Sequence, residues 1–246
     1  MRSILISISY DGTDFCGWQR QSKDRTVQQV IEDNLSRVCK EKVTITGCSR
    51  TDAGVHALDQ KATFKTICNI PTNKFALVLN AELPNDILIT NCEEVDINFH
   101  PRHEAKSKQY EYLIQNSLAI DIRDLRYCWH ITQQLNIAEM QKACSYFIGE
   151  HDFSTFCAAG SKVINRVRTV SKAELTVIEN NKLKFTIEGN GFLYKMVRIM
   201  VGSLVNVGLG KIKSTDLPNI ILSKCRDNAT TTAPAKGLCL KNIEYK

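Results

Sequence analysis

The sequence GCSRTDAGVHA, residues 47–57, lies between two stretches with β-strand character. A run of β-branched residues, Val43–Thr46, precedes it, and a second strand-like stretch, Gln60–Thr66, follows it. Glycine tolerates positive φ angles and close approach of other backbone. We therefore expect Gly47 and Gly54 to bracket a tight, preformed loop between two strands.

One cation and one carboxylate stand two residues apart in this loop, Arg50 and Asp52. A carboxylate held beside a guanidinium stays ionised at neutral pH, which makes Asp52 a candidate nucleophile rather than a candidate acid. The alternative is an ordinary surface turn in which Asp52 caps the loop backbone, as aspartate often does. The loop alone does not separate these two interpretations.

Outward from the loop, the first hundred residues alternate between strand and helix patterns. Ile4–Tyr10 places its apolar residues on one face, and Thr26 with Gln29 has the spacing of a capping box at a helix start. The predicted elements are strand Ile4–Tyr10, a helix from Val27 to Val38, strands Val43–Thr46 and Gln60–Thr66, helix Asn73–Ala81 and strand Ile87–Cys92. Strand, helix, strand, strand, helix, strand is the order of a ferredoxin-like sheet.

The second part of the chain repeats this pattern loosely. The polar, basic segment Asn98–Gln109 is interpreted as the crossing between two halves. After it we expect strand Tyr110–Ile114, a helix from Ile137 to Phe147, strands Ala173–Ile178 and Leu183–Glu188 joined by a turn at Asn180-Asn181, helices Phe192–Val207 and Leu217–Leu222, and a last strand from Gly237 to near Tyr245. These patterns predict an α+β protein with antiparallel sheets in two halves, residues 1–105 and 106–246, that share an interface.

The composition is that of a globular protein, and its modest positive charge is compatible with a polyanionic partner without being diagnostic of one. The chain has 246 residues, of which 43% are hydrophobic and 24% charged, and its formal net charge is +6. Its ten cysteines are scattered without metal-ligand spacing. No signal-peptide pattern and no apolar run of membrane-spanning length is found in the sequence. We therefore expect a cytoplasmic protein with reduced thiols and no membrane association.

Four other features invite a functional interpretation. Tyr110 stands on a predicted strand as either a core tyrosine or an aromatic platform for a base. Arg198 interrupts an apolar helix, so its charge must reach solvent or meet a carboxylate. His100 and His103 lack a third ligand nearby and are weak evidence for a metal. The segment Glu150–Ser154 is better explained as a helix-end loop than as a catalytic cluster. We expect no metal site.

Short motifs in a fixed order extend over the whole chain. They are YDGT (residues 10–13), GWQ (17–19), RTVQ (25–28), RTDAGVHA (50–57), LNA (79–81), LPNDI (83–87), FH (99–100) with Arg102, YEY (110–112), GEHDF (149–153), MVR (196–198) with Met200 and Gly202, and APA (233–235) with Gly237-Leu238. Through these motifs the sequence resembles the TruA-type pseudouridine synthases, the tRNA pseudouridine synthase A family, over essentially its full length. Departures from the family pattern occur at Ser49, Pro101, His103 and Gln109, and the first of these positions is glycine in many members.

The resemblance implies an isomerase that converts uridines at positions 38 to 40 of the tRNA anticodon stem-loop to pseudouridine. The implied fold is two ferredoxin-like halves whose antiparallel sheets join into one extended sheet, with a catalytic cleft between the halves. The implied assembly is a homodimer that works without metal or organic cofactor. Asp52 is implied to be the catalytic nucleophile, Tyr110 to pack on the target base, and Arg198 to pair with the aspartate. Arg50 is implied to help displace the base and hold the RNA, and Leu238 to supply an apolar wall.

The chemistry of this reaction leaves alternatives open. Pseudouridine formation breaks the N-glycosidic bond, turns the base and rejoins it through C5, and it consumes no second substrate. The target base must leave its stack, which suits an aromatic platform such as Tyr110. An ionised Asp52 would attack the sugar C1′ or the base C6, or abstract a sugar proton. The alternative functions are an enzyme of this class that acts on other RNAs and a non-catalytic RNA-binding relative.

Overall fold

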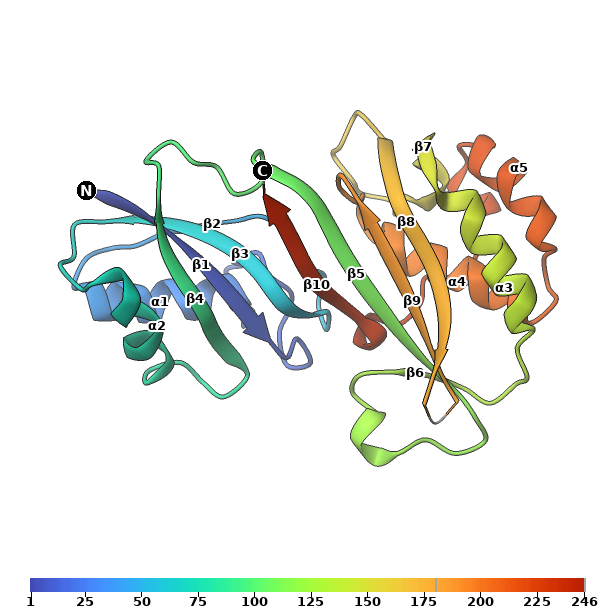
Figure 1. Ribbon diagram of the computed structural model, residues 1–246, viewed down its shortest axis with the longest axis horizontal. Helices are drawn as coiled ribbons and strands as arrows, with labels where there is room; N and C mark the ends of the chain where they lie inside the picture. Colours follow the sequence, from blue (N-terminus) through green and yellow to red (C-terminus); the bar gives the residue numbers. More distant parts are fainter. Residues whose placement is uncertain (180, 246) are drawn as a thin grey trace. The chain divides into compact units, whose positions relative to one another are not determined.

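The computed structural model describes residues 1–179 and 181–245 and is drawn in Figure 1. Residue contacts divide the chain into two compact units. Unit 1 comprises Met1–Lys106 and Cys239–Lys246, and unit 2 comprises Ser107–Leu238. The sequence pattern placed the whole of 106–246 in the second half. In the structure the last strand from Cys239 onward instead belongs to unit 1, where Cys239 and Leu240 pair with His56 and Ala57.

Unit 1 contains the predicted alternation of strands and helices. Its elements are β1 (Arg2–Tyr10), α1 (Val27–Cys39), β2 (Ile45–Gly47), β3 (His56–Thr66), α2 (Thr72–Asn80), β4 (Ile87–Val95) and β10 (Leu238–Tyr245). Helix α1 begins as its sequence predicts, because the Thr26 hydroxyl accepts a hydrogen bond from the Gln29 amide over 3.4 Å. Helices α1 and α2 contact each other, and α2 packs against β4 (Figure 1).

The sheet of unit 1 has the strand order β4-β1-β3-β2, and each neighbouring pair is antiparallel. This is the ferredoxin-like order, in which β3 separates β1 from β2. Strand β10 adds a short parallel pairing to the start of β3, with Cys239 opposite His56 and Leu240 opposite Ala57. Strands β2 and β10 therefore occupy different segments of the same edge of β3.

Unit 2 is also built from an antiparallel sheet and helices. Its regular elements are β5 (Ala105–Asn116), β6 (Trp129–Ile131), α3 (Ile137–Cys144), β7 (Gly149–Asp152), β8 (Val167–Ile178), β9 (Lys182–Gly189), α4 (Met196–Gly208) and α5 (Leu217–Leu222). The order β5-β9-β8-β7 is antiparallel at each pair, and β6 adds a short parallel pairing to β5. Helices α3 and α4 contact each other, and α3 packs on β8. The predicted α+β class, with an antiparallel sheet in each half, is confirmed.

Several strands begin earlier than their sequence patterns predict, among them β8, which begins at Val167 rather than Ala173. Strand β3 begins at His56 rather than Gln60, because its first residues pair with β1 and β10. Strand β5 begins at Ala105, inside the segment Asn98–Gln109 that was interpreted as a crossing. No helix within residues 1–179 and 181–245 is long and apolar enough to cross a membrane.

Two elements of unit 2, β7 and α4, also differ from prediction. The segment Glu150–Ser154, expected to be a helix-end loop, contains the end of β7, which pairs with the start of β8. Helix α4 begins at Met196 instead of Phe192, because Lys195 adopts a left-handed backbone conformation with φ +57°. Asn180, in the predicted hairpin turn, lies outside the described residues.

Candidate active site

The loop that carries Asp52, residues 48–55, connects β2 to β3 and is hydrogen-bonded at its start. The Cys48 amide donates to the Lys61 carbonyl over 2.8 Å and so continues the β2–β3 pairing. The fully buried Gln60 side chain accepts from the Ser49 amide over 3.1 Å and donates to the Ser49 carbonyl over 2.7 Å. One side chain thus satisfies both backbone groups of Ser49 and fixes the chain three residues before Asp52.

A second loop, between β1 and α1, holds the middle and end of the Asp52 loop. The Trp18 amide donates to the Thr51 carbonyl over 3.1 Å. The Gly54 amide donates to the Phe15 carbonyl over 3.2 Å. Fixed backbone therefore flanks Asp52 on both sides, which preorganises the position of its carboxylate.

Side chains from β1 and β3 close the base of the loop. The Tyr10 and Thr51 hydroxyls are hydrogen-bonded at 2.8 Å, and both residues are buried. His56 Nδ1 accepts from the Gly12 amide over 3.1 Å and lies 3.1 Å from Asp11 Oδ1. These contacts tie the start of β3 to the residues that follow β1.

The two glycines that bracket the loop are needed for different reasons. Gly54 has φ +76°, the left-handed conformation that glycine adopts without cost. Gly47 has no positive φ; it faces the indole of Trp18 instead. A Cβ at Gly47 would lie 2.4 Å from Trp18 Nε1, and the indole is 1% exposed and has no space to withdraw. The expected tight loop is confirmed, and at Gly47 close approach is the reason for glycine.

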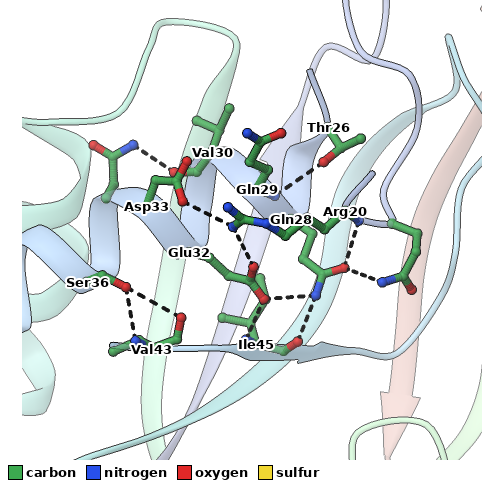
Figure 2. Close-up of polar contacts among 12 residues, drawn as sticks. Arg20, Thr26, Gln28, Gln29, Val30, Glu32, Asp33, Ser36, Val43 and Ile45 are labelled. Atoms are coloured by element: carbon green, nitrogen blue, oxygen red, sulfur yellow. Dashed lines mark hydrogen bonds and ion pairs between the residues drawn. The ribbon is translucent and has the colours of Figure 1, made fainter. Parts of the chain in front are cut away.

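A buried carboxylate on α1 ties β2 to the loop between β1 and α1. Glu32 is 4% exposed, and it accepts from the Ile45 amide over 3.0 Å and from the Arg20 guanidinium over 2.9 Å (Figure 2). Gln28 donates to Glu32 over 2.9 Å and to the Ile45 carbonyl over 3.2 Å. The hydrogen bond to Glu32 raises the pKa of Arg20. The sequence did not predict the buried role of Glu32 or the hydrogen bonds of Gln60 to Ser49, because polar residues in helices and strands more often face solvent.

The implied site residues are divided between the two units. Asp52 is half-buried and Arg50 is exposed, and both lie in unit 1. Tyr110, Arg198 and Leu238 lie in unit 2. The surroundings of Asp52 described above come from unit 1 alone, and its pairing with Arg198 stays a prediction.

In unit 2, Tyr110 and Tyr112 share the buried face of β5, as their spacing predicts. Tyr110 is 8% exposed, and its ring packs edge-on against Phe192 with 5.3 Å between ring centroids. Tyr112 is fully buried and its hydroxyl donates to the Pro234 carbonyl over 2.8 Å. Burial raises the pKa of Tyr112, against the opposing effect of the Arg198 charge. Tyr112 is therefore a neutral hydrogen-bond donor that holds the segment next to Arg198.

Arg198 is half-buried on α4 and is bound to a backbone carbonyl. Its Nε donates to the Ala233 carbonyl over 2.8 Å, and the Ala233 amide donates to the Arg198 carbonyl over 3.0 Å. Farther along this segment, a Cβ at Gly237 would lie 2.6 Å from the Tyr112 ring. Leu238 follows and is 6% exposed. Within unit 2 one short segment thus connects Arg198, Tyr112 and Leu238.

Comparison with known proteins decides the family. A family model described as tRNA pseudouridine synthase matches residues 6–104 and 143–246. The chain belongs to the tRNA pseudouridine synthase family. Three proteins named tRNA pseudouridine synthase A match over 100% of both chains: those of Ruminiclostridium cellulolyticum (50% identity), Caldicellulosiruptor saccharolyticus (48%) and Thermoanaerobacter sp. strain X514 (48%). The protein is therefore an isomerase that acts on uridine in tRNA, and the resemblance inferred from its motifs is confirmed.

Solved structures add a distant likeness. The chain aligns over 82% of its length with 44% of a chain in the crystal structure of the archaeal box H/ACA sRNP Nop10-Cbf5 complex, at 10% sequence identity and a TM-score of 0.38. The fold assignment above rests instead on the strand order of this chain.

Proposed function

We propose that the enzyme converts uridines at positions 38, 39 and 40 of the tRNA anticodon stem-loop to pseudouridine, with Asp52 as the nucleophile. The observation that carries the assignment of Asp52 is the support of its loop. Ser49, Thr51 and Gly54 are all hydrogen-bonded to buried side chains or to neighbouring backbone. A nucleophile must keep its position during the reaction, whereas an ordinary surface turn needs no such support.

The reaction is balanced without a second substrate. The C1′–N1 bond breaks and a C1′–C5 bond forms, while the proton on C5 leaves and N1 gains a proton. Asp52 has three routes into this sequence. It attacks C1′ and releases the base as an anion, it attacks C6 and forms an adduct with the base, or it removes a sugar proton. Each route requires an ionised carboxylate at a fixed position.

The remaining implied residues act on the displaced base. The target uridine leaves its stack at a cost of a few kcal/mol, and Tyr110, steadied by Phe192, offers the ring on which it packs. Leu238 supplies an apolar wall. Arg198 pairs with Asp52 and keeps it ionised, while the exposed Arg50 holds the RNA and helps to displace the base.

The proposal includes a homodimer in the cytoplasm, which rests on family membership. Sedimentation equilibrium should give about twice the 27.8 kDa mass of one chain. A monomer at concentrations at which tRNA is modified would contradict the dimer.

Mapping of modified positions tests the substrate. Transcripts of tRNA with uridine at 38, 39 and 40 are incubated with the enzyme, labelled with carbodiimide and read by primer extension. Transcripts with cytidine at these positions are the control. We expect pseudouridine at 38 to 40 alone. Modification only at other positions or in other RNAs would overturn the assignment of the stem-loop, and binding without any modification would favour a non-catalytic RNA-binding protein.

Salt dependence tests how the RNA is held. If lysine and arginine side chains neutralise phosphates, the logarithm of the association constant should fall linearly with the logarithm of the salt concentration, by about 0.7 to 0.9 for each phosphate. A flat response would show that charge contributes little to tRNA binding.

A further inference from the structure

The loop between β7 and β8 packs against the segment that leads from β9 into α4. The Ala158 amide of the loop donates to the Tyr194 carbonyl over 3.0 Å. At the start of β8, the side chain of Arg168 lies beside the same segment, because a Cβ on Gly191 would be 3.6 Å from Arg168 Nε. Ala158 and Arg168, the two ends of this part of the loop, therefore both adjoin the segment 190–195, and residues 158–168 and 190–195 are treated together as one surface of unit 2.

Two cations on this surface have no carboxylate partner among the residues that the structure describes. Arg168 is half-buried, and its guanidinium donates to the backbone carbonyls of Asn165 over 3.0 Å and Val167 over 2.6 Å. Burial lowers the pKa of Arg168. Lys195 holds its Nζ 5.0 Å from the centroid of the Tyr194 ring. Both cations keep their charge available to an anionic partner.

Neighbouring acidic residues do not neutralise this charge. Asp152, at the end of β7, pairs with Lys224 at 3.2 Å. Glu150 is a second, exposed carboxylate on β7. The loop itself adds Lys162, which is exposed, and Arg166, which is half-buried. Residues 158–168 and 190–195 thus contain four cations and no carboxylate, and this excess of positive charge favours a polyanion.

An exposed aromatic ring lies next to one of these cations, Lys195. Tyr194 exposes 44% of its surface. Lys195, which follows it, has φ +57° and ψ 12°, a left-handed conformation that is costly for a residue other than glycine. Strained backbone of this kind concentrates at binding sites. An exposed ring flanked by cations is the arrangement by which proteins hold single-stranded nucleic acid.

The same segment reaches the residue that is implied to bind the target base. Phe192 packs against the Tyr110 ring with 5.3 Å between centroids. Tyr194 is two residues farther along, and two residues of chain span at most about 7 Å. The exposed ring of Tyr194 and the ring that packs against Tyr110 therefore belong to the same short segment of unit 2.

We propose that Tyr194, Lys195 and Arg168 form a surface that binds the RNA strand next to the target uridine. Tyr194 stacks on an unpaired base, and the two cations contact the phosphates that flank it. This inference rests on the proposed function and adds to it the residues that hold the flanking strand. Stacking is tolerant of base identity, so the surface fits RNA of varied sequence.

Equilibrium binding of tRNA to the full-length enzyme tests the stacking role. Tyr194→Ala should weaken binding by about 5- to 150-fold, the loss typical of one stacked base, while Tyr194→Phe should bind like the wild type. The control is Tyr127→Ala, because Tyr127 also lies in unit 2 and is 41% exposed. We expect no change in affinity for that control.

The salt dependence of binding tests the cation role. Lys195→Asn removes the charge and keeps a residue type that tolerates the left-handed conformation, and it should reduce the salt slope by about one. Lys40→Asn is matched to it, because Lys40 is an exposed lysine with φ +55° at the end of α1. We expect Lys40→Asn to leave the slope unchanged.

Two outcomes would overturn the inference. One is that Tyr194→Ala binds tRNA with wild-type affinity. This includes the case in which the substitution changes only the oligomeric state, because Tyr194 would then belong to a protein interface. The other is Lys195→Asn with an unchanged salt slope. Failure of the proposed function is distinguishable from both outcomes, because it appears as wild-type enzyme that binds tRNA without forming pseudouridine at positions 38 to 40.

Discussion

Gly47→Ala is the substitution that tests most severely how the Asp52 loop is built. An added Cβ would lie 2.4 Å from Trp18 Nε1, 2.5 Å from Cε2 and 2.7 Å from Cζ2. Favourable contacts between such atoms are about 3.5–4.0 Å long, so the ring would have to move by about 1 Å. Trp18 is 1% exposed, and its amide is bonded to the Thr51 carbonyl. Movement of the ring therefore strains the backbone next to Asp52.

The magnitude follows from overpacking of a buried site. Such changes typically destabilise by 1–3 kcal/mol, and we expect about 2–3 kcal/mol because three ring atoms are met at once. For a chain of this size, 1 kcal/mol lowers Tm by about 2–4 °C, which gives a fall of roughly 4–12 °C. Thermal unfolding is followed by far-ultraviolet circular dichroism, which reports on the helices and strands of both units and therefore also on a control variant in unit 2.

The control for this prediction is Gly191→Ala. A Cβ there meets its nearest atom, Arg168 Nε, at 3.6 Å, an ordinary contact, and we expect its stability to stay within about 0.5 kcal/mol of wild type. The activity of Gly47→Ala should fall by more than the loss of folded protein accounts for, because the displaced backbone is that of the Asp52 loop. A Gly47→Ala enzyme with wild-type Tm and wild-type activity would refute this account of the loop.

Three smaller predictions follow from burial. The Ser49 Oγ is buried with no hydrogen-bond partner among the described residues. In urea unfolding, Ser49→Ala should therefore leave the free energy of unfolding unchanged or raise it by up to about 1 kcal/mol. A decrease of about 1 kcal/mol would contradict this prediction. In the same assay Glu32→Ala should lower the free energy of unfolding by about 1–3 kcal/mol, because Glu32 is buried. Asp33 binds the same Arg20 side chain but is exposed, so Asp33→Ala should lower it by at most about 1 kcal/mol. Equal losses for the two variants would contradict this ranking. Burial raises the pKa of Cys144 to about 12, so this thiol stays protonated and unreactive at pH 8. Alkylation followed by mass spectrometry should label the exposed Cys16 and Cys225 first, and early labelling of Cys144 would contradict this.

Much of the fold was predictable because it follows local periodicity. The strand–helix order of unit 1 was visible as alternating and helical patterns, and the sheet order agrees with the ferredoxin-like arrangement that this order indicates. The position of β10 was not predictable in the same way, because a strand's own pattern does not name its pairing partner. Strand β7 was missed because GEHD is polar and half-exposed at a sheet edge, and it carries no apolar alternation.

The sequence predicted the residues of the Asp52 loop, but it did not predict the contacts that hold this loop in place. Gly47 and Gly54 were expected to bracket a tight loop through positive φ or close approach, and Gly54 has a positive φ. That Gly47 is required by the Trp18 ring depends on a contact between residues far apart in sequence, which a pattern cannot show. Arg198 was expected to reach solvent or a carboxylate, and a backbone carbonyl, that of Ala233, is one of its partners. The proposed pairing of Arg198 with Asp52 is a prediction that the family resemblance carries.

The central claim is that Asp52 is the nucleophile, and tritium release tests it most directly. Single-turnover release from tRNA that carries 5-tritiated uridine is compared between wild type, Asp52→Asn and Asp59→Asn. Asp59 is the matched control, because it is another half-buried aspartate near the loop, paired with Lys61 at 2.7 Å. We predict that Asp52→Asn binds tRNA as tightly as wild type and loses release by about 10⁴-fold or more, while Asp59→Asn releases tritium at close to the wild-type rate. Release by Asp52→Asn within about tenfold of wild type would contradict the claim.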